Sequence, residues 1–168
     1  DGKTMYFTRN NYNDGKKRKS DDKVIMEKIY KAELVNGEWT NVKEVPFSND
    51  NYKTAHPTLS PDEKTMYFAS DMPGSFGFSD LYKVSIDSNG KFGTPENLGP
   101  NINTEGRETF PFVDVDNNLF FASDGHPGLG GLDIFEAKSA KKKKKKPLNV
   151  GKPLNSPMDD FGYVTNKD

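Results

Sequence analysis

The sequence predicts an all-β fold built from short antiparallel strands, and three observations lead to this class. Aromatic residues make up 12% of the 168 residues while all hydrophobic residues make up only 32%, a balance that suits thin sheets better than helical packing. Segments of about five to seven β-branched or aromatic residues recur between clusters of Gly, Pro, Asn and Asp, which is typical of short strands. These segments repeat with a period of about 50 residues.

The clearest repeated element is a strand with two adjacent aromatic residues, which we label strand B. Residues 65–71, TMYFASD, recur as residues 118–124, NLFFASD, and in a more diverged form as residues 4–10, TMYFTRN. Three further elements, strands C, D and A, keep the same spacing. They lie at residues 28–31, 80–83 and 133–136 for C, at 42–46, 95–99 and 147–151 for D, and at 56–60, 110–114 and 161–165 for A.

Four short strands in a unit of about 50 residues are the arrangement of a β-propeller blade. An isolated four-stranded sheet of this size leaves both faces wet, so the units must stack around an axis. We therefore predict a propeller of four-stranded antiparallel blades with about three blade equivalents present. Because propellers close with about four to eight blades, we expect a fragment of a larger, about six-bladed propeller. The predicted units are residues 1–52 (strands B-C-D), 53–106 and 107–160 (strands A to D), and 161–168 (a last strand A).

The hairpin at residues 60–64, the strand after it and the Asp80-Leu81-Tyr82 strand resemble the WD-like repeat of TolB-type propellers. Residues 128–135, GLGGLDIF, and 95–104, PENLGPNINT, further resemble propellers of Bacteroidota OmpA-family, peptidoglycan-associated proteins and of the type IX secretion system. The resemblance covers nearly the whole chain. It implies a non-catalytic scaffold in the periplasm, associated with the outer membrane, that binds envelope proteins such as outer-membrane or secretion-complex components. It implies contact with peptidoglycan only through a domain outside this chain.

Charge and composition argue against several other partners. Lys and Arg total 24 against 25 Asp and Glu, a net charge of −1, so no overall field attracts nucleic acid or a membrane surface. No window approaches the roughly 18 consecutive apolar residues of a membrane span, so we expect no membrane insertion. The chain has no cysteine, which excludes disulfides and thiolate metal sites.

One lysine run interrupts the third copy of the repeat at residues 141–146. Counted back from strand D, Lys144 falls where the other copies have Trp39 and Phe92. We expect these two aromatic rings to fill equivalent positions between blades. A lysine there would lose roughly 1.5 to 3 kcal/mol of side-chain burial, so we place no site in this run. A solvated loop or an uncertain stretch of sequence is favoured over a basic tract for an anionic surface.

The residues that most resemble chemical motifs have structural explanations. Residues 114–118, DVDNN, open like a calcium loop, but the required Gly and the final Glu are missing, so we predict a hairpin turn. His56 and His126 lie in different elements and lack the partners of a triad or a zinc site. Asp80 and Asp133 share one repeat position, which favours a repeated structural hydrogen bond. We therefore predict no catalytic, cofactor-binding or metal-binding residues.

Two functional hypotheses remain. In a blade the B-C and D-A connections emerge on one face, and exposed apolar groups rimmed by charge there are typical of a protein-binding surface, unless the loops fold back and bury Phe76 and Phe78. The alternative is a carbohydrate-active propeller enzyme, similar to glycoside hydrolases, with Glu108 and Asp159 as its carboxylates. The polar insertion at residues 11–23 is expected to be a mobile loop. The expected interaction face comprises Met72, Phe76, Phe78, Glu105, Arg107, Glu108, His126, Leu129, Asp159 and Asp160.

Overall fold

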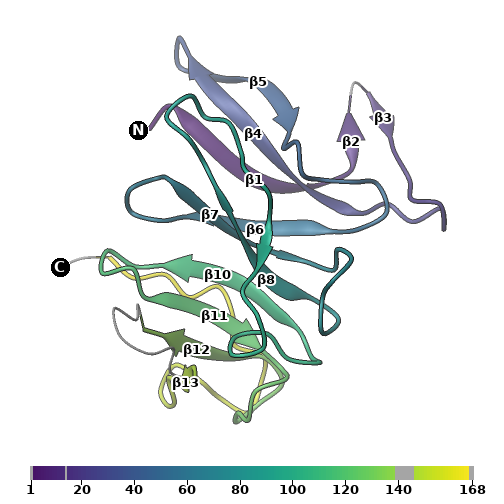
Figure 1. The fold of residues 1–168 in the computed structure, drawn as a ribbon. Helices are drawn as coiled ribbons and strands as arrows, with labels where there is room; N and C mark the ends of the chain where they lie inside the picture. The colour runs from purple at the N-terminus through teal and green to yellow at the C-terminus, as the bar shows by residue number, and fades with distance from the viewer. Residues whose placement is uncertain (1, 14, 139–145, 167–168) are drawn as a thin grey trace.

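The computed structural model describes residues 2–13, 15–138 and 146–166 (Figure 1). Every regular element within these residues is a β-strand, and no helix occurs among them. The strands form three antiparallel sheets, which follow one another along the chain, and one small hairpin. The expected all-β class is therefore confirmed.

Neighbouring strands in each sheet are consecutive along the chain, apart from the inserted hairpin. The first sheet consists of β1 (Thr4–Asn10), β4 (Glu27–Val35) and β5 (Glu38–Glu44). The second consists of β6 (Thr54–Leu59), β7 (Thr65–Ser70), β8 (Asp80–Ser85) and β9 (Glu96–Asn97). The third consists of β10 (Glu108–Val113), β11 (Leu119–Ser123), β12 (Asp133–Ala137) and β13 (Leu148–Asn149). As predicted, Phe68 and Phe121 lie on corresponding strands, β7 and β11.

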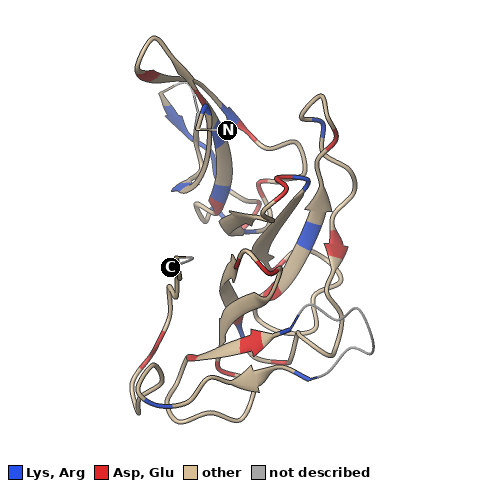
Figure 2. Ribbon diagram, turned by 90° about the vertical axis from the view of Figure 1, so that its left-hand side faces the viewer, with Lys and Arg blue, Asp and Glu red and all other residues tan. Residues whose placement is uncertain are grey.

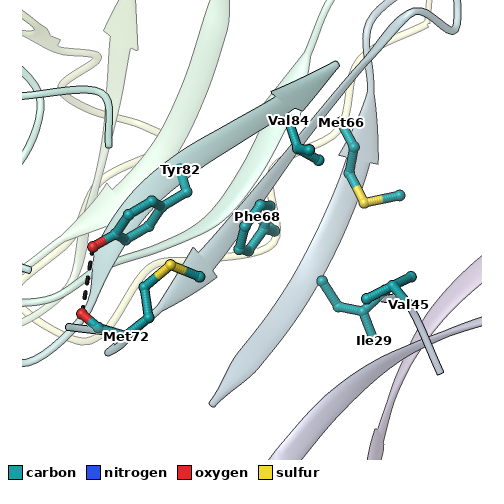
Figure 3. Packing of buried hydrophobic residues seen from close by; sticks show 7 residues of the cluster. All are labelled: Ile29, Val45, Met66, Phe68, Met72, Tyr82 and Val84. Atoms are coloured by element: carbon teal, nitrogen blue, oxygen red, sulfur yellow. Dashed lines mark hydrogen bonds between the residues drawn. The ribbon is translucent and has the colours of Figure 1, made fainter. Parts of the chain in front are cut away.

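The apolar core lies between the sheets. Figure 3 shows the cluster between the first and second sheets, where the hydroxyl of Tyr82 also donates to the carbonyl oxygen of Met72 at 3.5 Å. A second cluster joins Ala69 and Leu81 of the second sheet to Phe121 and Phe135 of the third. Each fully buried large side chain contributes about 1.5 to 3 kcal/mol relative to exposure. The first cluster comprises Ile29, Val45, Met66, Phe68, Met72, Tyr82 and Val84.

The expected equivalence of Trp39 and Phe92 is wrong. Phe92 packs between the sheets, edge-on to Tyr6 at 6.0 Å and to Phe47 at 5.3 Å. Trp39 is 45% exposed, because β4 and β5 continue as a long ladder in which it pairs with Leu34 on the solvent side. The comparison with Lys144 falls outside the described residues.

The insertion at residues 11–23 is held by polar contacts. Its strands β2 (Tyr12–Asn13) and β3 (Lys16–Lys17) form a two-stranded hairpin. Asn11 is fully buried and donates through Nδ2 to Asp50 Oδ1 at 2.7 Å. Arg18 Nε lies 3.5 Å from Asp50 Oδ2. These contacts tie the described part of the insertion to Asp50 in place of the apolar anchor that the segment lacks, and its expected mobility stays a prediction.

The predicted last strand A, residues 161–165, runs beside β10 but is not a strand (yellow in Figure 1). A strand is defined by its ladder of hydrogen bonds, and no described strand pairs with this segment. It packs through its rings instead: Phe161 stacks on Phe110 at 4.8 Å, and Tyr163 contacts Phe120 at 4.9 Å.

Backbone angles also move the predicted alignment of this segment by one residue. His56 and Phe110 have positive φ angles of 54° and 48°, and Gly162 has 73°. Asp160 accepts from Ser156 as Glu108 accepts from Thr104. Gly162, and not Phe161, is therefore the counterpart of His56 and Phe110.

Candidate functional site

The B-C and D-A loops lie together on one face of the molecule, as the strand directions predict. Phe78 N donates to Gly106 O at 2.9 Å, which ties the loop after β7 to the loop before β10. A Cβ on Gly77 would stand 2.3 Å from the same carbonyl oxygen, so the close approach of the two backbones requires glycine there. The ring of Phe78 is therefore held by a fixed backbone.

The residues of the expected interaction face divide into exposed and buried groups. Phe78 is 75% exposed, and Phe76 and Leu129 are exposed as well, so the loops do not fold back over these rings. Glu105 and Arg107 are also exposed. Met72 is only 9% exposed, because its N–H donates to Ser70 Oγ at 3.1 Å and turns it over the core. Its assignment to an exposed face is wrong.

Glu108 is a buried structural carboxylate. It accepts hydrogen bonds from Thr104 N and Thr104 Oγ1, each at 2.7 Å, and from Ser123 Oγ at 2.6 Å. Asp159 is exposed and accepts from Leu132 N at 2.9 Å. Because its oxygens are committed to the fold, Glu108 cannot act with Asp159 as the carboxylate pair of a glycosidase.

The other sequence candidates hold loops in place. His126 Nε2 lies 2.8 Å from Ile102 O, and its ring packs against Phe121 and Phe135. Asp114 Oδ1 accepts from Asp116 N at 2.9 Å and from Asn118 N at 2.7 Å, which confirms the predicted hairpin turn.

A pocket of about 260 Å³ opens between the three sheets near the inner strands β6 and β10. It collects the residue that precedes strand C in each copy, namely Glu27, Ser79 and Leu132. The pocket therefore draws on all three repeats. Its other lining residues are Lys53, Ala55, His56, Ala69, Ser70, Asp71, Phe78, Arg107, Thr109 and Phe110.

Two strained residues form the inner wall of this pocket. His56 and Phe110 adopt left-handed backbone angles where the β6–β7 and β10–β11 registers shift, which marks a β-bulge in each inner strand. Their rings stack at 3.9 Å with an interplanar angle of 18°. Left-handed backbone costs about 1 to 2 kcal/mol for a residue other than glycine, and such strain gathers at functional sites.

The ring and the backbone of His56 each contact one hydroxyl group. Its Nδ1 lies 2.8 Å from Thr109 Oγ1, and its backbone N donates to Thr8 Oγ1 at 2.8 Å. Burial lowers the pKa of His56 below its ordinary value of 6.5, and the charge of Glu27 opposes this shift. The ring is therefore neutral at pH 7, with Glu27 close enough to influence it.

Charge in the pocket comes from Glu27, Asp71, Lys53 and Arg107. Figure 2 shows acidic and basic residues on all three sheets, so the mixed charge of the pocket agrees with that of the rest of the molecule. Asp71 recurs as Asp124, whereas the position of Glu27 carries Ser79 and Leu132 in the other copies. Glu27 is thus the acidic group that belongs to one repeat only.

Sequence reasoning missed Glu27, Lys53 and Asp71. The signal that could have identified Glu27 was its departure from the repeat at the residue before strand C. Lys53 and Asp71 could not be placed, because only the bulges in β6 and β10 bring these loop residues around one pocket.

Solved structures with a similar fold include three propeller-type hydrolases. A puromycin hydrolase matches 86% of this chain and 21% of its own, with a TM-score of 0.55 and 17% identity. A puromycin-hydrolyzing peptidase of Mycobacterium tuberculosis matches 95% and 23%, with a TM-score of 0.57 and 17% identity. An α-L-arabinofuranosidase of Lactobacillus brevis matches 92% and 55%, with a TM-score of 0.54 and 15% identity. The chain spans between a fifth and little more than half of these proteins.

These neighbours correct the expectation of a non-catalytic scaffold, since all three are named as hydrolases. At this identity the likeness establishes the shared fold. No protein-family model and no curated protein matches the chain. The outer-membrane resemblance, the periplasmic location and the envelope partners stay predictions.

No helix in residues 2–13, 15–138 and 146–166 is long and apolar enough to span a membrane. In the same residues no group of three or more His, Asp or Glu side chains could hold a metal ion.

Proposed function

We propose that this chain is part of a propeller hydrolase that acts on carbohydrate. The three sheets form a portion of a larger propeller of about six blades, a number within the usual range for closure. The observation that carries the proposal is the pocket at the inner strands, in which Glu27 departs from the repeat beside the strained residues His56 and Phe110.

The pocket, more than the neighbours, favours a sugar substrate, because the neighbours include both a glycosidase and two puromycin-cleaving proteins. The pocket also offers aromatic rings, His56, Phe78 and Phe110, against which the apolar face of a sugar can pack.

The pocket supplies the two carboxylates that glycoside hydrolysis needs. In the described structure the Glu27 carboxylate is not engaged in a hydrogen bond, so it is available to exchange a proton with the glycosidic oxygen. Asp71 accepts from Lys53 N through Oδ1 at 2.6 Å, which fixes its position at the pocket edge. Asp71 is the second carboxylate in this scheme, acting on the other side of the scissile bond.

The test is hydrolysis of a panel of aryl glycosides by the full-length protein and by its Glu27→Gln variant. Loss of a group that transfers a proton lowers kcat by about 100-fold or more. Thermal unfolding should change little, because the Glu27 side chain makes no hydrogen bond within the described residues.

The matched control is Glu105→Gln, which changes an exposed glutamate outside the pocket and should leave kcat unchanged. Hydrolysis that is equally fast in both variants would exclude Glu27 as the proton donor. Absence of glycoside hydrolysis by the full-length protein would overturn the proposed function.

A further inference from the structure

Two basic residues occupy the same repeat position at the candidate pocket. Lys53 N donates to Asp71 Oδ1, and Arg107 N donates to Asp124 Oδ1, each at 2.6 Å. Both residues line the pocket, one before β6 and the other before β10. The repeat therefore places two cations around the opening. The third copy carries Asp159 at this position, so a basic residue is not required by the fold.

The backbones of both residues are fixed while their side chains stay accessible. Ser70 Oγ donates to Lys53 O at 2.5 Å, and Arg107 forms a parallel bridge with Ser79. Both residues are exposed. A fixed backbone with an accessible charged end suits the recognition of a ligand that enters the pocket.

Asp124 and Asp71 leave N–H groups of the Arg107 and Lys53 side chains available to a ligand. Asp124 Oδ2 accepts from Arg107 Nη1 at 3.3 Å, and a guanidinium carries further N–H groups in a planar fork. Exposed ion pairs of this kind are weak, so a ligand can compete for the fork. Asp71 uses its Oδ1 on the backbone of Lys53, and within the described residues no hydrogen bond or ion pair engages the Lys53 ammonium.

An aromatic platform lies beside the guanidinium. Arg107 Cζ stands 5.7 Å from the centre of the Phe78 ring, and that ring is 75% exposed. The hydrogen bond from Phe78 N to Gly106 O fixes the loop that carries the ring. Apolar surface beside a planar cation matches a sugar that has one apolar face and a carboxylate at its edge.

We infer that the substrate of the proposed hydrolase carries a carboxylate, as in a uronic acid, and that Arg107 and Lys53 bind it. Arg107 meets the carboxylate with two N–H groups, Lys53 adds a point charge, and Phe78 contacts the sugar ring. That the acidic sugar is a substrate rests on the proposed function, but its binding can be tested without catalysis.

The experiment compares the binding of methyl β-D-glucuronide with that of its neutral counterpart, methyl β-D-glucoside. Titration calorimetry on the full-length protein carrying Glu27→Gln prevents turnover during the measurement. Charge-assisted hydrogen bonds predict that the glucuronide binds about tenfold more tightly or better. The preference should shrink as salt rises, because the cations are exposed.

Two variants show which side chains cause the preference for the glucuronide. Arg107→Ala should reduce glucuronide affinity about tenfold and Lys53→Ala several-fold, while glucoside binding changes little. Lys64→Ala, at an exposed turn outside the pocket, is the matched control and should change neither. Having two variants protects the test if one of them folds poorly.

The outcomes separate this inference from the proposed function. Equal binding of the two sugars, binding of neither, or a preference that survives both variants overturns the inference. Glycoside hydrolysis that depends on Glu27 would then still support the proposed function. Conversely, Arg107-dependent glucuronide binding without hydrolysis of any glycoside would support the acidic-sugar site and overturn the hydrolase.

Discussion

The second and third sheets share an internal latch that the first sheet lacks. Asp80 accepts from Phe76 N at 2.9 Å and from Gly77 N at 3.1 Å. Asp133 accepts from Leu129 N at 2.5 Å and Gly130 N at 3.1 Å. Each carboxylate holds the loop between strands B and C.

The first sheet carries Lys28 at the same repeat position. Its Nζ donates to Tyr52 O at 2.9 Å, away from its own B-C loop. That loop is the place of the β2–β3 insertion. In the first sheet the donor Lys28 thus stands where the other sheets have an acceptor. The same sheet has a different B-C loop and carries Glu27 just before Lys28.

A second latch shows the same contrast. Asn103 pairs with both backbone groups of Leu81, at 2.8 and 3.0 Å, and Asn155 does so with Ile134, at 2.8 and 2.9 Å. In the first sheet Ile29 N donates to Thr54 Oγ1 at 3.3 Å instead. Repeated polar contacts therefore mark the framework, and of the residues that depart from them in the first sheet, Glu27 lines the pocket.

The largest expected effect on stability is that of breaking the latch with Asp80→Ala. Asp80 is fully buried, and besides the two loop N–H groups it accepts from Asn97 Nδ2 at 2.6 Å. Loss of this acceptor should reduce the free energy of unfolding by about 3 kcal/mol, measured by urea denaturation. Asp87→Ala is the control, because Asp87 also accepts two N–H groups but in an exposed turn. Equal losses in both variants would contradict a buried latch.

A smaller effect is expected from Lys28→Met in the first sheet. Burial lowers the pKa of Lys28, while the nearby carboxylates of Glu44, Asp50 and Asp71 oppose the shift. Burying an ammonium is costly, so an apolar side chain of similar volume should leave the free energy of unfolding within about 1 kcal/mol of the parent at pH 7. The measurement is the same urea titration. A loss as large as that of Asp80→Ala would show that the lysine serves as a latch after all.

The smallest effect concerns the pH dependence that His56 contributes. Its pKa is lowered in the folded protein, so below its ordinary value of 6.5 the unfolded chain binds more protons. Its contribution to stability is fully present above pH 6.5 and is lost as the pH falls toward the folded pKa.

The test compares the free energies of unfolding of the parent and the His56→Gln variant at about pH 7.5 and about pH 5.5, on either side of the ordinary pKa of histidine. The parent should lose more on acidification, by less than about 1 kcal/mol after allowance for solvent screening. A parallel pH dependence in the two proteins would argue against a lowered pKa.

The repeat itself was predictable from sequence because its strands follow a local rule. Strands B and C keep the same apolar positions, and Asp80 and Asp133 keep the same role, so the places of β7, β8, β11 and β12 followed from the spacing of the repeat. Trp39 was misplaced because the length of the β4–β5 ladder depends on hydrogen bonds that a pattern of residue types does not encode.

The candidate site was less predictable for a geometric reason. The positive φ angles of His56 and Phe110 redirect the inner strands, and neither histidine nor phenylalanine predicts such a bulge. Met72 and Glu108 were assigned to an exposed face from their places in the repeat, yet both are buried by contacts with Ser70, Thr104 and Ser123.

The ring column of His56, Phe110 and Phe161 links three consecutive repeats, with spacings of 3.9 and 4.8 Å. Proteins built from repeats can lose their units one at a time, since each unit contacts only its neighbours. A stack that takes one ring from each repeat couples those losses, because removal of one unit exposes a ring face on the next. Under a pulling force the chain should therefore unfold cooperatively in a single event, and not one repeat at a time.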